Sequence, residues 1–208
     1  MSLGACFGFV KLVFSRYYIG MHVNKIHSYL ERLSNLLRSE MRGAGADAGL
    51  QPVQIDALNY LATCNRYSDT PMGVTEYLGQ TKGTVSQTLK VLERKGLLKR
   101  KLDRQDRRVT HLRVTPAGRR LLDRIVPAAN FVDGCQLLDA KAQRQIEQSL
   151  ATLLRSVQKA GGCKTFGVCH TCRFNRDQGD GSFYCELVKA KLSEADVQLI
   201  CREHEEVA

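Results

Sequence analysis

The residues with the most evident chemistry form two groups, a polar run in the middle of the chain and a cysteine cluster near its end. Between residues 81 and 90 the polar side chains are hydrogen-bond donors and acceptors with no carboxylate among them, which base edges and phosphates accept. The candidate contact residues there are Thr81, Lys82, Thr84, Ser86, Gln87 and Lys90. Residues 103–108 read DRQDRR, and arginines favour the narrow, electronegative minor groove of DNA. These candidates are Arg104, Arg107 and Arg108.

The elements that must position these groups follow from local patterns. A helix over 72–78 should end at Gly79, and Thr81 is a suitable N-cap for the next helix. Val85, Leu89 and Leu92 recur at helical spacing and give that second helix a single apolar face. Strand-like runs at 97–102 and 109–114 flank the charged tip, where Asp106 could pair with a wing arginine. Two helices, a short turn and a hairpin in this order predict a winged helix-turn-helix.

The same stretch resembles the MarR family of bacterial winged-helix regulators. The resemblance is carried by QTKGTVSQTLKVLERKGLL at 80–98, by the D-x-x-D-R-R pattern at 103–108 and by L-x-V-T-P-x-G at 112–118. It covers residues 23–160 and implies a homodimer with the second helix of the motif in the major groove. Carried over by position, the groove-facing residues are Thr84, Ser86, Gln87 and Lys90, and the minor-groove arginine is Arg107.

The net charge of +10 is unevenly distributed along the 208 residues. Residues 81–125 hold 14 basic and 4 acidic side chains, a net +10, whereas residues 161–208 hold 6 basic and 8 acidic, a net −2. The positive charge therefore coincides with the predicted motif, which favours double-stranded DNA as the partner and a steep salt dependence of affinity. The basic residues do not follow one long amphipathic helix, so no membrane partner is expected.

Three domains are expected. Residues 1–20 are an N-terminal extension that could be a packed segment, sequence upstream of a start at Met21, or a cloning scar. Residues 21–160 are the winged domain, with helices at 22–41, 51–64, 115–125 and 138–159 and a loop at 43–49. The first and last helices carry apolar stripes, and the resemblance implies that they build a dimer interface. Two recognition helices would then lie about one DNA turn apart, which predicts an inverted-repeat operator.

The third domain, residues 161–208, contains five of the eight cysteines. Without a secretory signal, the chain is expected in the reducing cytoplasm, where clustered cysteines indicate metal binding. The spacing selects Cys169, Cys172, Cys185 and Cys201 as a closed tetrahedral set, with His204 or Cys163 as alternative ligands. Zinc is the favoured ion, and an iron–sulfur cluster is the alternative. A short strand is expected at 182–185, and a helix capped by Ser193 should carry Cys201 near its end.

The predicted fold is mainly α with a β-hairpin wing, long dimerisation helices and a metal-stapled C-terminal module. The predicted function is that of a sequence-specific transcriptional regulator, a repressor by preference, and not an enzyme. Release would follow either a small phenolic or lipophilic ligand, as the resemblance implies, or a change at the cysteine tail. One alternative is an iron–sulfur or redox-sensing regulator. Another, from a different class, is a metal-stabilised protein-interaction module.

Overall fold

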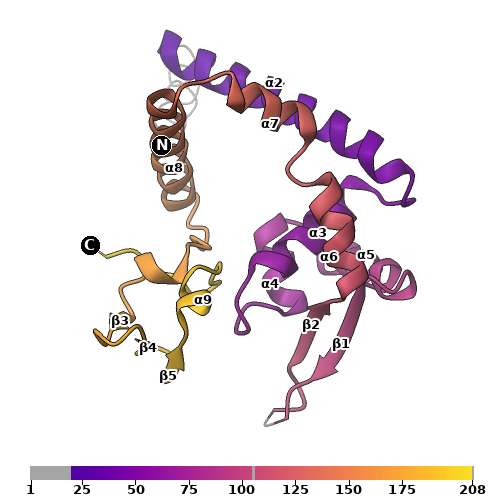
Figure 1. The fold of residues 1–208 in the computed structure, drawn as a ribbon, viewed down its shortest axis with the longest axis vertical. Coiled ribbons are helices and arrows are strands. Elements are labelled where there is room, and N and C mark those ends of the chain that lie inside the picture. The colour runs from indigo at the N-terminus through magenta and orange to yellow at the C-terminus, as the bar shows by residue number, and fades with distance from the viewer. Residues whose placement is uncertain (1–19, 105, 208) are drawn as a thin grey trace, which may run out of the picture. The chain divides into compact units, whose positions relative to one another are not determined.

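The computed structural model describes residues 20–104 and 106–207, so the predicted extension lies, apart from Gly20, outside the described residues. The chain divides into two compact units at the boundary between Glu40 and Met41. The elements labelled in Figure 1 are α2 (Met21–Ala46), α3 (Pro52–Thr63), α4 (Pro71–Leu78), α5 (Lys82–Arg94), β1 (Leu98–Leu102), β2 (Thr110–Val114), α6 (Pro116–Ile125), α7 (Ala129–Gln136), α8 (Ala140–Ala160), β3 (Asn175–Asp177), β4 (Phe183–Cys185), β5 (Ala190–Leu192) and α9 (Glu194–Val197). A short 3₁₀ turn, η1, spans Cys169–Thr171.

A winged helix-turn-helix forms the centre of the second unit, as predicted. Helices α3 to α6 group together, and the hairpin β1–β2 extends from them (Figure 1). Its antiparallel register pairs Leu98 with Val114 and Lys101 with His111. Their shared core contains fully or almost fully buried side chains from each element. These include Ile55, Leu58, Val74, Val85, Leu89, Leu92, Leu98, Leu112 and Leu122. Burial of this apolar surface is the main force that holds the motif together.

Local sequence signals set the helix boundaries in the motif. Gly79 takes the left-handed conformation, with φ of 60°, and closes α4. The Thr70 and Thr115 side chains cap α4 and α6 by accepting hydrogen bonds from the backbone N–H of Gly73 and Gly118. The predicted helix-turn-helix and wing are therefore confirmed to within a residue or two at each end.

One prediction about the flanking helices is wrong, and one helix was not predicted. The predicted loop at 43–49 is largely helical, because α2 continues to Ala46. A Cβ added at Gly45 would lie 2.7 Å from Ile55 Cδ1, so this glycine allows close packing rather than a flexible loop. Helix α7 was not predicted, and α8 begins at Ala140, where the Asp139 side chain caps it by accepting from the N–H of Ala142. None of the α8 side chains is buried.

The C-terminal tail folds as a small module with a three-stranded antiparallel sheet, β3–β4–β5. Cys169, Leu192 and Val197 form its buried centre. The Ser193 cap of α9 is confirmed as a reciprocal pair with Asp196, but α9 ends at Val197. The prediction that Cys201 lies near the end of this helix is therefore wrong. Cys201 lies in the loop that follows the helix. Throughout the described residues, no helix is both long and apolar enough to span a bilayer.

Candidate nucleic-acid interface and cysteine cavity

Helix α5 is fixed by its cap and by its apolar face. Thr81 Oγ1 accepts from the backbone N–H of Thr84 at 3.1 Å, and the two threonine hydroxyls lie 3.0 Å apart. Val85 and Leu89 are buried in the winged core. With that face buried, the opposite side of α5 must face solvent. The role of Thr81 is thus mainly to position the helix.

The predicted contact face of α5 is exposed. Burial of these side chains against other parts of the molecule would have contradicted the recognition role. The exposed residues are Lys82, Thr84, Ser86, Gln87 and Lys90. Together they present hydroxyl, amide and ammonium groups without a carboxylate, so the surface can accept a polyanion without repelling it.

The wing tip is ordered by hydrogen bonds from two aspartates. Asp103 Oδ1 accepts from the Asp106 N–H at 2.8 Å, and Asp106 Oδ1 accepts from the Arg108 N–H at 3.0 Å. The arginine paired with Asp106 is Arg108, through Nε at 3.1 Å. Arg104, Arg107 and Arg108 are all exposed at this tip. The described residues of the tip therefore offer three cationic side chains to solvent.

A polar network that the sequence reading missed connects the wing to the loop before α4. The His111 ring on β2 lies between two carboxylates, with Nδ1 2.5 Å from Asp69 Oδ1 and Nε2 3.1 Å from Asp103 Oδ2. Asp69 is 3% exposed, and its second oxygen faces Arg113 Nε at 3.5 Å. Side chains alternate between the two faces of β2, which places His111 and Arg113 on the same face. This alternation was the sequence signal that could have indicated the network.

The same network changes the titration of its members. Burial lowers the pKa of His111, but hydrogen bonds and charges from Asp69 and Asp103 outweigh burial, so the pKa is raised overall. Burial raises the pKa of Asp69, although His111 and Arg113 oppose the shift. A protonated imidazole can donate to both carboxylates, and it therefore ties the wing to the α3–α4 loop.

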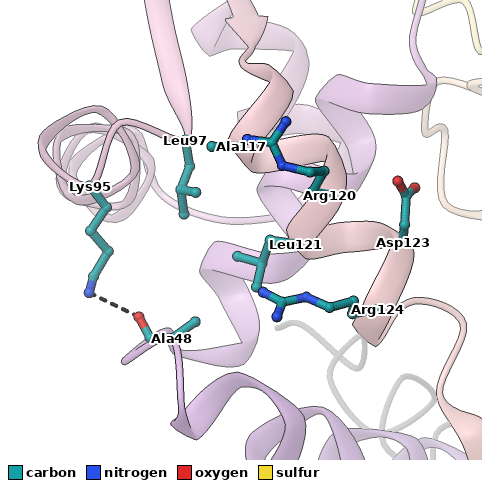
Figure 2. Close-up of a pocket in the computed structure, with 8 residues that line it drawn as sticks. All are labelled: Ala48, Lys95, Leu97, Ala117, Arg120, Leu121, Asp123 and Arg124. Carbon is teal, nitrogen blue, oxygen red and sulfur yellow. Dashed lines mark hydrogen bonds between the residues drawn. The ribbon is translucent and has the colours of Figure 1, made fainter.

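An open pocket of about 780 Å³ lies between the end of α5 and helix α6 (Figure 2). Lys95 Nζ donates to the carbonyl of Ala48 at 3.0 Å across one side of it. The Arg120 and Arg124 side chains extend along the pocket, whereas the Asp123 carboxylate points away from them (Figure 2). The lining is thus basic and partly apolar, which suits a small anionic molecule.

The four predicted cysteine ligands line one small cavity in the tail. The cavity has a volume of about 20 Å³. Cys169 belongs to η1 and Cys172 follows it directly, whereas Cys185 ends β4 and Cys201 lies in the loop after α9. Asn65, from the winged domain, completes one side. Folding therefore brings together sulfurs that are up to 32 positions apart in the chain.

Hydrogen bonds already converge on three of these sulfurs. Asn65 Nδ2 donates to Cys169 Sγ at 3.4 Å, and the Glu205 N–H donates to Cys172 Sγ at 3.5 Å. The Cys169 thiol donates to Cys201, which lowers the pKa of Cys201 to about 6 and, together with burial, raises the pKa of Cys169. Within residues 20–104 and 106–207, no three or more Cys, His, Asp or Glu side chains already stand in a metal-holding arrangement.

The two alternative ligands lie elsewhere. His204 is buried, and its Nδ1 and Nε2 lie 2.9 Å from the hydroxyls of Thr165 and Thr171, respectively. Burial lowers the pKa of His204, which favours the neutral ring. Cys163 is exposed and, with His204, lines a separate open depression. Neither His204 nor Cys163 lines the four-sulfur cavity.

The tail is attached to the winged domain next to α4. Arg202 forms a two-pronged ion pair with Glu76, with Nε–Oε2 and Nη2–Oε1 distances of 2.6 and 2.7 Å. The Asn65 N–H donates to the Ile200 carbonyl at 2.9 Å, and the Ile200 N–H donates to the Thr63 carbonyl at 3.0 Å. The cysteine cavity is therefore connected to the helix that precedes the turn of the DNA-binding motif.

Comparison with known proteins agrees with this geometry. A MarR family model matches residues 48–109. The structure is similar to that of the S. aureus MepR–DNA complex, with 26% identity, a TM-score of 0.51 and coverage of 64% of this chain and 98% of that chain. A MarR transcriptional regulator from Methanosarcina mazei Go1 has the same fold, with 20% identity, a TM-score of 0.57 and coverage of 66% and 99%.

Another solved structure, CouR from Rhodococcus jostii RHA1 bound to p-coumaroyl-CoA, also shares the fold. It has 22% identity and a TM-score of 0.52, and the match covers 62% of this chain and 90% of that one. No curated protein matches the chain. The compared structures are matched almost completely, yet about a third of this chain lies outside each match.

Proposed function

We propose, from the MarR family domain at residues 48–109, that this chain is a transcriptional regulator that reads double-stranded DNA with α5 in the major groove. The observation that carries the proposal is the exposed, carboxylate-free face of α5, which lies opposite the buried Val85 and Leu89. The DNA-bound MepR structure, which shares 26% of its residues with this chain, supports the same use of the fold.

Within this face, amide and ammonium groups have different roles. Gln87 can pair with an adenine edge through two hydrogen bonds, and such bidentate contacts discriminate between bases. Lys90 and Lys82 neutralise phosphates, which raises affinity for any sequence. Loss of Gln87 should therefore change sequence preference, whereas loss of Lys90 should weaken binding and reduce its salt dependence.

The wing is proposed to enter the neighbouring minor groove. Arg107 is exposed next to Asp106, whose N–H donates to Asp103 Oδ1. The narrow minor groove concentrates negative potential and attracts an inserted guanidinium. Pairing of Arg108 with Asp106 leaves Arg107 as our first choice for the inserted side chain.

A homodimer is proposed on the basis of α8. Ile146, Leu150, Leu154 and Val157 are between 45% and 61% exposed and follow helical spacing along one side. An apolar stripe of this kind is normally covered by another helix, and a second copy supplies one by symmetry. Dimerisation makes the expected binding site an inverted repeat, with half-sites about one helical turn apart.

Repression, with release by a bound signal, is the regulatory mode that we favour. Two inputs are proposed. A small ligand could change the spacing of the two recognition helices, and the basic pocket beside α6 is where an anionic ligand would be sought. The cysteine tail is the other input, because its contacts reach the α3–α4 junction through Asn65 and Arg202.

Selection of binding sites from random DNA with the full chain tests this proposal. A palindromic consensus is the expected result. Recovery of DNA without a consensus would instead favour the protein-interaction module. On the selected site, Arg107→Ala should weaken binding about tenfold by fluorescence anisotropy, consistent with loss of one charged groove contact. Arg144→Ala, an exposed arginine on α8, is the matched control and should leave the affinity unchanged.

A further inference from the structure

The tail has too small a core to account for its fold. Its buried apolar side chains are Leu192 and Val197, beside Cys169 and Cys172. Its sheet consists of three strands of three residues each. Modules of this size usually require a disulfide or a metal ion for stability. All the tail cysteines are free thiols in the structure, so a metal is the stabiliser to consider.

The chain brings four sulfurs to one place from three separate segments. Cys169 and Cys172 flank the 3₁₀ turn η1, where the Cys172 N–H donates to the Cys169 carbonyl at 3.0 Å. Cys185 ends β4, paired with Asn175 and Ala190 on its two neighbours. Cys201 follows α9, and its own N–H donates to the Gly167 carbonyl at 2.9 Å. Backbone hydrogen bonds and strand pairing therefore hold the backbone of each of these segments beside the cavity.

The cavity suits a single ion. Its volume of about 20 Å³ gives room for about one small occupant, such as a water molecule or a single ion. Tetrahedral zinc with Zn–S bonds of about 2.3 Å would place the sulfurs about 3.8 Å from one another. All four cysteines line this one cavity, which places four thiols around the space that such an ion would occupy.

The donors around the sulfurs suit thiolate ligands. Asn65 Nδ2 donates to Cys169 Sγ at 3.4 Å, and the Glu205 N–H donates to Cys172 Sγ at 3.5 Å. Hydrogen bonds from N–H groups spread the negative charge of metal-bound sulfur and orient the ligands. The apolar side chains of Leu187, Val188 and Leu192 also line the cavity, and Leu192 is buried. With four protein ligands no coordination position is left open, so the site is structural.

From these observations, we propose that Cys169, Cys172, Cys185 and Cys201 bind one thiophilic divalent ion of the zinc class. Binding releases the thiol protons and stabilises the tail. Asn65 links the cavity directly to the winged domain, since it donates to Cys169 while its Oδ1 accepts from the Ser68 hydroxyl at 2.7 Å. Occupancy of the site therefore stabilises the loop immediately before α4.

Metal analysis of the full chain tests the proposal, with Zn²⁺ alone as the probe under reducing conditions. We expect one zinc per chain, and Co²⁺ in its place should give the visible absorption of a tetrahedral thiolate complex. Cys172→Ser and Cys185→Ser should each weaken Zn²⁺ binding at least 100-fold, the upper end of what loss of a supporting hydrogen bond costs. Cys163→Ser removes an exposed thiol outside the cavity and should retain one zinc per chain.

Three results would overturn this assignment. The wild-type chain could fail to retain Zn²⁺, it could contain iron and sulfide with visible absorption, or Cys163→Ser could lose the metal as readily as Cys172→Ser. Folding of each variant is checked by circular dichroism of the winged domain, whose core does not include the cavity sulfurs. These results are independent of DNA binding, which is measured separately.

Discussion

The ion pair between Glu76 and Arg202 is one of the side-chain contacts that dock the tail on α4, beside the Phe166 ring against Tyr60 and Tyr77. Glu76→Ala, Arg202→Ala and the double variant form a cycle that isolates the pair. The two side chains are 30% and 24% exposed, and they make two charge-assisted hydrogen bonds of 2.6 and 2.7 Å. The pKa of Glu76 is lowered, mainly by its hydrogen bond to Arg202, which shows that the pair favours the charged form.

The expected coupling free energy lies between two reference values. Exposed ion pairs contribute about 0.2–1 kcal/mol, and hydrogen bonds to charged groups contribute about 1.5–3 kcal/mol. Since about a quarter of each side chain remains in contact with water, we expect about 1.5–2 kcal/mol for the pair. This corresponds to about a 10- to 30-fold change in the docking equilibrium.

Amide hydrogen exchange measures this equilibrium directly. The N–H groups of Asn65 and Ile200 are bonded across the junction, so their protection reports undocking of the tail. The part of the fall in protection that the cycle assigns to the pair should be about 10- to 30-fold. The effect should shrink in acid, because a depressed carboxyl pKa gives stability that is present above the unfolded value and is lost as the pH falls through the folded one.

The matched control is the pair Arg173–Glu205, which lies within the tail at 2.8 Å with both side chains 54% exposed. Its coupling should stay below about 1 kcal/mol. A Glu76–Arg202 coupling under about 0.5 kcal/mol, or equal effects for both pairs, would refute the claim that burial makes the α4 contact the stronger one.

Other predictions test the wing and the close-packed glycines. Wild type should be more stable than His111→Gln, with the full difference below about pH 6.5. The difference should decline as the pH rises through the raised pKa of His111. The reason is that a group whose pKa is higher in the folded than in the unfolded state stabilises the fold only while it is protonated. Urea unfolding across that range measures it, with the exposed His27→Gln as control, and a pH-independent difference would contradict the His111 network. Gly118→Ala should destabilise by about 1–3 kcal/mol, because its Cβ would lie 2.5 Å from the Leu97 carbonyl oxygen. Gly134→Ala has open space within a helix and should stabilise by about 0.5–1 kcal/mol, so equal thermal shifts for the two variants would rule out the packing explanation.

The sequence alone determined the winged helix-turn-helix because its signals are local. Thr81, Gly79 and the spacing of Val85, Leu89 and Leu92 act within one or two helical turns, so the sequence shows which face of α5 must remain exposed. Cysteine spacing likewise selected the four sulfurs that the fold brings to one cavity. The exposed arginines of the wing follow from the charged tip between two strands.

Only the tertiary structure decided which polar groups meet across the fold. His111 joins Asp69 and Asp103, over 42 and 8 positions, and Arg202 reaches Glu76 over 126 positions. It also showed that His204, a candidate ligand from the sequence, lies between the hydroxyls of Thr165 and Thr171. Such contacts depend on packing between distant segments, and periodicity along one segment carries no information about a neighbour that is far away in the chain. Local sequence thus determined the winged helix-turn-helix, whereas long-range packing decided how the C-terminal tail contacts it.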